Sequence, residues 1–107
     1  PYGPAIVTPD EIDPHNLMLR TFVNGNLRQE TNTDDLIFDC YEIIEFLSTA
    51  FTLEPGDVIA TGTPSGVGAA MQPQATLQVG DRVKVEIEGL GLIDNEVIAE
   101  PDTAIIA

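Results

Sequence analysis

One stretch of this chain repeats its apolar residues at helical spacing, and it lies between two regions whose apolar residues alternate or gather in short runs. The helical stretch carries the apolar set Leu36, Cys40, Ile43, Ile44 and Leu47, with Asp39, Glu42 and Glu45 on the other side. Residues three and four positions apart share one helix face, so this set predicts an amphipathic helix near residues 34–49. Asn32 or Thr33 can cap its start. The chain is therefore predicted to be a mixed, β-rich α+β fold with one helix.

A β-hairpin is predicted before the helix. Asn24-Gly25 separates the extended runs "LMLRTFV" and "NLRQET". Both central positions of a type I′ turn need a positive φ, which Asn and Gly tolerate best, so this pair favours a two-residue hairpin turn. We expect the hairpin over about residues 17–30.

Two tight turns are predicted after the helix. Residues 53–59, "LEPGDVI", and residues 77–83, "LQVGDRV", share a Leu-x-x-Gly-Asp-x-hydrophobic pattern. The first turn is expected to launch a strand over Asp57–Thr61. The second is expected to launch a strand over 82–88, where apolar and charged residues alternate. A last strand is predicted in "LIDNEVIA", residues 92–99, and no linker divides the chain, so residues 1–107 form part of one domain.

The charge balance restricts the partners. Of 107 residues, 18 are acidic and 4 are basic, which gives a formal net charge of −14 at pH 7. Such a chain repels phosphate backbones and anionic lipid, so we expect no nucleic-acid and no membrane partner. The single cysteine excludes an internal disulfide framework, and we expect a soluble, cytoplasmic protein. The chain opens without Met, and Val7 already lies in a strand-like run, so we expect an entry into the middle of a larger fold.

A glycine-rich loop, "TGTPSG", follows the predicted strand over residues 57–61. Gly62 and Gly66 would let backbone amides approach a ligand, and Thr63 and Ser65 can donate hydrogen bonds to an anion such as a carboxylate. An ordinary Gly/Pro turn explains the same spacing equally well. No Lys follows the glycines and no Gly-x-Gly-x-x-Gly is present, so this is neither a P-loop nor a dinucleotide-binding loop.

Four segments in order resemble the carboxyl-terminal half of the fumarylacetoacetate hydrolase family: "GPAIVTPDEIDPHNL", "VNGNLRQETNTDDLIF", "LEPGDVIATGTPSGVG" and "LQVGDRVKVEIEGLG". The resemblance covers nearly the whole chain, from Gly3 to about Asn95. The resemblance implies a mixed β-roll and a Mg²⁺- or Mn²⁺-dependent enzyme that hydrolyses, decarboxylates or isomerises 2-oxo acids or their enols. It also implies that Thr63, following Gly62, binds the substrate carboxylate, and that the complete protein forms a homodimer.

No metal ligand and no catalytic residue is assigned within this chain. The resemblance places the metal ligands and a catalytic Lys upstream of Pro1, so the chain alone is predicted to be inactive. Glu86 and Glu88 form a Glu-x-Glu pair, but it lies on a predicted strand and lacks the further oxygen ligands that a hard cation needs. A solvated strand face is the better interpretation of this pair.

The remaining candidate residues favour structural roles. His15 has no second His or Cys nearby and is interpreted as a surface histidine. Cys40 lies on the apolar helix stripe and is interpreted as a buried thiol. Tyr2, Phe38 and Tyr41 are expected in the core or in subunit contacts.

Two functional classes stay open. The chain is either the carboxylate-binding part of a metal-dependent enzyme or a non-catalytic β-rich binding or assembly module. Sequence upstream of Pro1 distinguishes them, because a Glu-x-Glu followed by an Asp and a Lys supports the enzyme.

Overall fold

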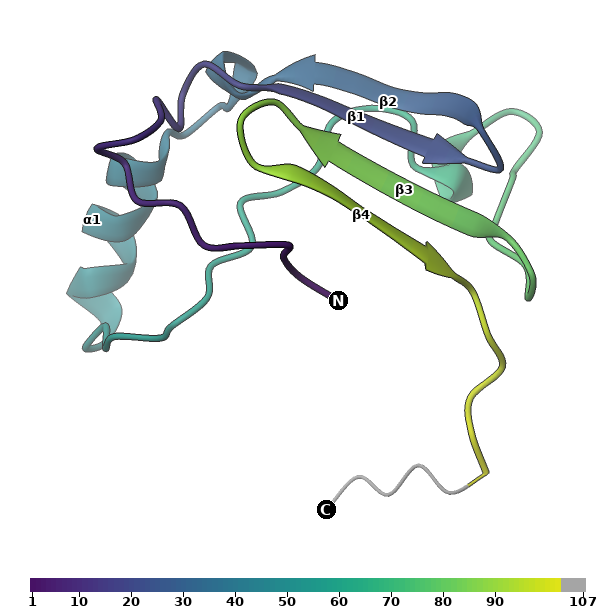
Figure 1. Ribbon diagram of the computed structural model, residues 1–107. Coiled ribbons are helices and arrows are strands. Elements are labelled where there is room, and N and C mark those ends of the chain that lie inside the picture. The colour runs from purple at the N-terminus through teal and green to yellow at the C-terminus, as the bar shows by residue number, and fades with distance from the viewer. Residues whose placement is uncertain (103–107) are drawn as a thin grey trace.

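The computed structural model describes residues 1–102. Its elements follow in the order β1 (Met18–Val23), β2 (Asn26–Asn32), the 3-10 turn η1 (Thr33–Asp35), α1 (Cys40–Ala50), the 3-10 turn η2 (Gly68–Ala70), β3 (Arg82–Ile87) and β4 (Gly91–Glu96). Four strands and a single α-helix in this part of the chain confirm the β-rich α+β class (Figure 1).

The strands form one antiparallel sheet in the order β2-β1-β3-β4. The predicted hairpin is confirmed: β1 and β2 are joined by Asn24 at φ 50° and Gly25 at φ 80°, the positive values that a type I′ turn requires. The predicted strand over 82–88 is confirmed as β3, which pairs with β1 on one side and with β4 on the other. The sheet is therefore built from segments that lie up to about 80 residues apart in the sequence.

The β1–β2 pairing contains a bulge. Thr21 pairs with Gln29 and Phe22 pairs with Leu27, so Arg28 is an extra residue with no partner on β1. In a regular strand, Arg28 and Gln29 would point to opposite faces of the sheet. A bulge re-aims the side chains beside it, and here both residues line the same cavity.

The predicted start of the helix at residue 34 is wrong. Helix α1 begins at Cys40, because the Asp39 carboxylate accepts the Glu42 N–H (2.8 Å) while the Glu42 carboxylate accepts the Asp39 N–H (2.8 Å). This reciprocal capping box fixes the first turn there. Asn32 does act as a cap, but only for the three-residue turn η1.

The predicted strand over residues 57–61 is also wrong, as is the strand-like run around Val7. Neither segment takes part in a ladder with any described residue. Val58 is 80% exposed, so little of the described chain covers its side chain. A strand needs a partner for its N–H and C=O groups, and local sequence cannot supply one.

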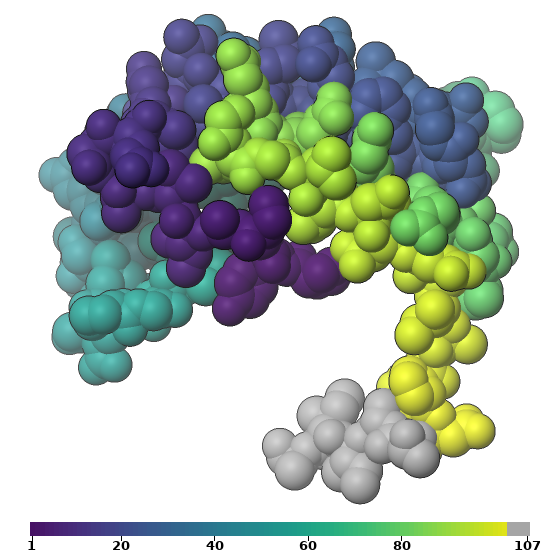
Figure 2. All heavy atoms as spheres, in the orientation of Figure 1, coloured from purple at the N-terminus to yellow at the C-terminus, as the bar shows by residue number. Residues whose placement is uncertain are grey.

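The described chain is open in shape. Its radius of gyration is 16.1 Å, whereas a compact domain of this length has a radius of about 13 Å. Helix α1 lies beyond one end of the sheet, and the chain after β4 leads away from the body (Figures 1 and 2). Leu17 is the single buried apolar residue in the described part. No helix among residues 1–102 is both long and apolar enough to cross a bilayer.

Candidate functional site

The glycine-rich loop runs alongside the bulge of β2. A Cβ at Gly66 would clash with the Arg28 carbonyl oxygen, and a Cβ at Gly68 would clash with the Ala75 carbonyl oxygen. Gly66 also has φ +103°, which L side chains rarely adopt. Gly66 therefore serves the packing of the loop on the chain itself, a role that the sequence did not suggest.

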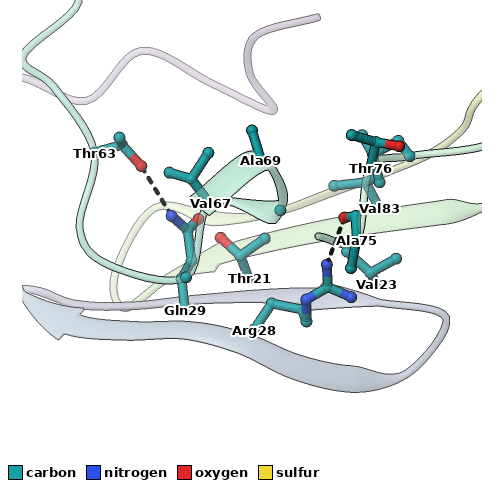
Figure 3. A pocket seen from close by; sticks show the side chains of 13 residues that line it. Thr21, Val23, Arg28, Gln29, Thr63, Val67, Ala69, Ala75, Thr76 and Val83 are labelled. Carbon is teal, nitrogen blue, oxygen red and sulfur yellow. Dashed lines mark hydrogen bonds between the residues drawn. The ribbon is translucent and has the colours of Figure 1, made fainter. Parts of the chain in front are cut away.

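Side chains from the bulge fasten the glycine-rich loop and also the later segment at Ala75. The Gln29 amide donates to the Thr63 hydroxyl (2.9 Å) and to the Pro64 carbonyl (3.1 Å), and the Arg28 guanidinium donates to the Ala75 carbonyl (3.1 Å), as Figure 3 shows for the bonds to Thr63 and Ala75. The loop is thus held by β2 although it belongs to no sheet.

Thr63 stands between two cavities. The larger one, of about 720 Å³, includes Gly62 and Thr63 in its wall. The smaller one, of about 490 Å³, includes Thr63, Arg28 and Gln29. Gln29 therefore approaches the Thr63 hydroxyl from the side of the smaller cavity, and we call the two spaces the large cavity and the small cavity.

The large cavity is mostly apolar, and its polar lining includes hydroxyl and amide residues and one acidic residue, Asp35. Its apolar wall includes Val7, Leu17, Leu19, Ile43, Ile87 and Leu90. No Lys or Arg of the described chain lines it. An apolar wall with a few convergent donors is the usual build of a small-molecule site, and here the donors come from the Gly62–Thr63 segment.

The backbone N–H groups of the glycine-rich loop have no backbone partner in the described chain. Residues 58–66 make no backbone–backbone hydrogen bond with any other part of the described chain. Gly62 has φ +101° and nothing within 4 Å of the position that a Cβ would take. Gly62 and Thr63, the two residues that the sequence singled out, therefore line the large cavity, and their backbone N–H groups make no backbone hydrogen bond in the described chain.

Other sequence candidates lie elsewhere or have different roles. His15 is half-buried, and its Nε2 accepts the Cys40 N–H (3.0 Å), so it helps to cap α1 instead of standing on the surface. Cys40 is half-buried and lines the large cavity, so it is less covered than the apolar stripe predicted. Tyr2, Phe38 and Tyr41 are exposed in the described chain, so they do not belong to the core of this segment, and their placement in subunit contacts stays a prediction.

The acidic residues of the described chain do not form a metal site. Residues 1–102 contain no group of three or more His, Cys, Asp or Glu side chains that could hold an ion. Glu86 lies in β3 with its carboxylate 3.9 Å from the Lys84 ammonium, and Glu88 is exposed in the turn that follows. The described residues therefore bring together no set of carboxylates for the octahedral oxygen site that Mg²⁺ prefers.

Sequence reasoning missed Gln29 and the packing role of Gly66. β2 contains one apolar residue, Leu27, so its alternation is too weak to reveal a register shift. In the sequence, the bulge is marked only by the adjacent polar residues Arg28 and Gln29 shortly after the Asn24-Gly25 turn.

Comparison with known proteins identifies the family of this chain. The family described as "Fumarylacetoacetate (FAA) hydrolase C-terminal" matches residues 1–98. The chain belongs to the fumarylacetoacetate hydrolase family. This confirms the resemblance seen in the sequence, and the family is one of hydrolases, isomerases, decarboxylases and tautomerases.

Individual members of the fumarylacetoacetate hydrolase family match over most of this chain. A mitochondrial oxaloacetate tautomerase from Bos taurus is 50% identical over 99 residues, which make up 92% of this chain and 32% of that protein. A fumarylacetoacetate hydrolase from Exiguobacterium antarcticum superposes with a TM-score of 0.90 at 49% identity, over 94% of this chain and 36% of that one. The predicted membership of this fold is confirmed.

A third match carries ligands. Maleylpyruvate hydrolase from Sphingobium sp. SYK-6, solved in complex with manganese(II) and pyruvate, superposes with a TM-score of 0.80 at 41% identity, over 90% of this chain and 34% of that one. The present chain spans about a third of the length of the curated relatives named oxaloacetate tautomerase.

Proposed function

We propose that the protein carrying this chain is a metal-dependent enzyme that acts on 2-oxo acids or their enols, and that this segment supplies the loop that binds the substrate carboxylate. The observation that carries the proposal is the position of Gly62 and Thr63 at the wall of the large cavity, with a hydroxyl and unpaired backbone beside an apolar wall. A solved relative that holds pyruvate supports a small 2-oxo acid as the ligand.

The chemistry of the segment is recognition of an anion. The Thr63 hydroxyl and the free N–H groups near Gly62 donate to carboxylate oxygens, which only accept. The apolar wall excludes water from one side of the ligand, and hydrogen bonds to charged groups are stronger where water is excluded. Binding of the carboxylate at Thr63 fixes the orientation of the neighbouring 2-oxo group.

The proposal assigns Mg²⁺ or Mn²⁺ and the general base to parts of the full-length protein outside the described residues. Residues 1–102 contain no cluster of metal ligands, and no cation of this segment lines the large cavity. A bound carboxylate here has to be balanced by a positive charge from elsewhere, which the manganese of the maleylpyruvate hydrolase structure illustrates. The choice among hydrolysis, decarboxylation and isomerisation lies with those other groups.

Replacing the Thr63 hydroxyl tests the proposal. Thr63→Val keeps the shape and removes the donor, and a hydrogen bond to a charged group contributes about 1.5–3 kcal/mol. We expect kcat/KM of the full-length protein to fall about ten- to a hundredfold on oxaloacetate or an acylpyruvate. Thr63→Ser keeps the hydroxyl and should stay near the wild-type value. Equal kcat/KM for wild type and Thr63→Val, on a substrate that the wild type converts, would show that this loop does not bind the carboxylate.

A second candidate is an assembly role, including the homodimer that the family resemblance implies. It is favoured by large apolar side chains that the described chain leaves exposed, among them Ile37 at 89% and Phe46 at 73%. Contiguous exposed apolar surface is typical of contact faces. Light scattering of the full-length protein tests it, and a monomer mass that does not change with concentration would count against self-association.

A further inference from the structure

The Gln29 side-chain amide donates two hydrogen bonds to the glycine-rich loop. Its Nε2 lies 2.9 Å from the Thr63 hydroxyl oxygen and 3.1 Å from the Pro64 carbonyl oxygen (Figure 3 shows the first). One amino group with two protons thus contacts two oxygens of adjacent residues.

The Pro64 carbonyl decides which end of the Gln29 amide faces the loop. The nitrogen and oxygen ends of a glutamine amide have nearly the same shape, so their assignment depends on the partners. A carbonyl oxygen only accepts, and so the amino end must face Pro64. The same amino end then donates to Thr63, which makes the Thr63 oxygen an acceptor on this side.

This arrangement leaves the Thr63 proton to another partner. Within the described chain the hydroxyl has one further acceptor in reach, the Pro64 carbonyl at 3.4 Å, which already receives a shorter bond from Gln29. Gln29 lines the small cavity and does not line the large one. The hydroxyl therefore accepts from the small-cavity side, and the bond that it donates to Pro64 is so long that a better acceptor in the large cavity can take the proton.

We propose that Gln29 is a positioning residue, which holds the Thr63 hydroxyl as a donor toward the large cavity and so sets the affinity for the substrate carboxylate. The inference rests on the proposed function. A freely rotating hydroxyl would present a lone pair to the carboxylate part of the time, and a carboxylate can bind only the proton. Accepting a bond from Gln29 also polarises the hydroxyl and strengthens the bond that it donates.

The competing explanation is that Gln29 only braces the loop. A double-mutant cycle separates the two, because an orienting role depends on the Thr63 hydroxyl and a bracing role does not. The cycle consists of wild type, Gln29→Met, Thr63→Val and the double variant, in the full-length protein with Mn²⁺ present. Its readouts are KM and kcat on oxaloacetate and the Kd for pyruvate from calorimetry.

We expect Gln29→Met to raise both KM and the pyruvate Kd about three- to tenfold, which is the range of one neutral hydrogen bond, with kcat changed less than about twofold. In the Thr63→Val background the same substitution should leave both constants unchanged. Gln29→Glu replaces the donor by an acceptor at nearly constant volume and should weaken binding at least as much, so it serves if Gln29→Met fails to fold.

A matched control lies on the neighbouring loop. The Gln78 amide donates to the Thr76 hydroxyl at 3.3 Å and to the Thr76 carbonyl at 3.4 Å, a similar but longer pair of bonds outside the large cavity. Gln78→Met should leave KM and Kd unchanged.

Three outcomes would overturn the inference. If Thr63→Val weakens binding and Gln29→Met does not, Gln29 does not orient the hydroxyl, while the proposed function stands. If Gln29→Met weakens binding equally with and without the hydroxyl, Gln29 is only a brace. If Thr63→Val itself leaves binding unchanged, the proposed function and the inference both fail.

Discussion

The two Leu-x-x-Gly-Asp turns of this chain have the same sequence pattern and the same local geometry, yet they lead to different structures. In the first unit, residues 53–59, the Asp57 carboxylate accepts the Glu54 N–H at 2.8 Å. In the second unit, residues 77–83, the Asp81 carboxylate accepts the Gln78 N–H at the same distance. The second unit continues into β3, which is paired on both sides, whereas the first continues into a segment with no ladder in the described chain.

The difference shows which part of a turn-and-strand unit is local. The turn is closed by residues within four positions of one another, so its sequence is sufficient. The strand depends on neighbours, and the second unit has them because Asn24 of the hairpin turn bonds to Asp81 (2.9 Å) and to the Arg82 N–H (2.9 Å). In the first unit the missing ladder leaves backbone donors unpaired just before Gly62 and Thr63. Under the proposed function, that unpaired backbone is where the ligand binds.

The largest expected effect comes from breaking the attachment to β2 of the glycine-rich loop that follows the first unit. Gly66→Ala puts a Cβ against the Arg28 carbonyl at φ +103°, and we expect a loss of at least about 3 kcal/mol in the free energy of unfolding. Gly56→Ala is the matched control, because it has φ +96° and open space, and it should cost only about 1–2 kcal/mol. Urea unfolding of both variants measures the difference, and equal losses would show that the loop is not held at Gly66.

A smaller effect is expected from removing the two aspartates. Asp81 accepts from the Gln78 N–H and from the Asn24 amide, whereas Asp57 accepts from the Glu54 N–H. We expect Asp81→Ala to lower the free energy of unfolding about twice as much as Asp57→Ala, since two bonds are lost instead of one. Thermal unfolding followed by circular dichroism compares them. A larger loss for Asp57→Ala would mean that the first unit is tied to the sheet as firmly as the second.

Acid should act on the second unit through Asp81. Hydrogen bonds from the Gln78 backbone and from Asn24 lower the pKa of the Asp81 carboxyl from its ordinary value of 3.8. A lowered folded-state pKa gives stability that is fully present above the unfolded-state value and is lost as the pH falls through the folded-state value. Wild type should therefore lose stability below about pH 4 more steeply than Asp81→Asn. Parallel curves for the two proteins between pH 5 and pH 2 would rule out this contribution.

The smallest effect is expected at Val58, the counterpart of Arg82 in the two units. Its side chain is 80% exposed, so Val58→Arg should change the free energy of unfolding of the 107-residue chain by less than about 0.5 kcal/mol. Chemical denaturation measures it. A loss well above that value would reveal a packed neighbour for this segment.

The sequence predicted features that depend on nearby residues. The Asn24-Gly25 hairpin, both Gly-Asp turns and the alternating strand β3 follow from conformational preference and local hydrogen bonds. The stretch containing Thr63 was also located correctly as a loop.

Three features could not be predicted because they depend on distant contacts or on a choice between similar caps. The strand over residues 57–61 lacks a partner. The helix start moved from residue 34 to Cys40, since Asp39 and Glu42 together form a better cap than Asn32 does. The bulge that brings Gln29 to Thr63 arises from the register between two strands, and the polar sequence of β2 does not encode it visibly.

A crystal structure of the full-length protein with Mn²⁺ and pyruvate tests the central claim most directly. The account predicts a pyruvate carboxylate oxygen within about 3.2 Å of the Thr63 hydroxyl, with the Gln29 amide on the other side of that hydroxyl. A pyruvate carboxylate bound away from Gly62 and Thr63, with the loop contacting only protein, would contradict it.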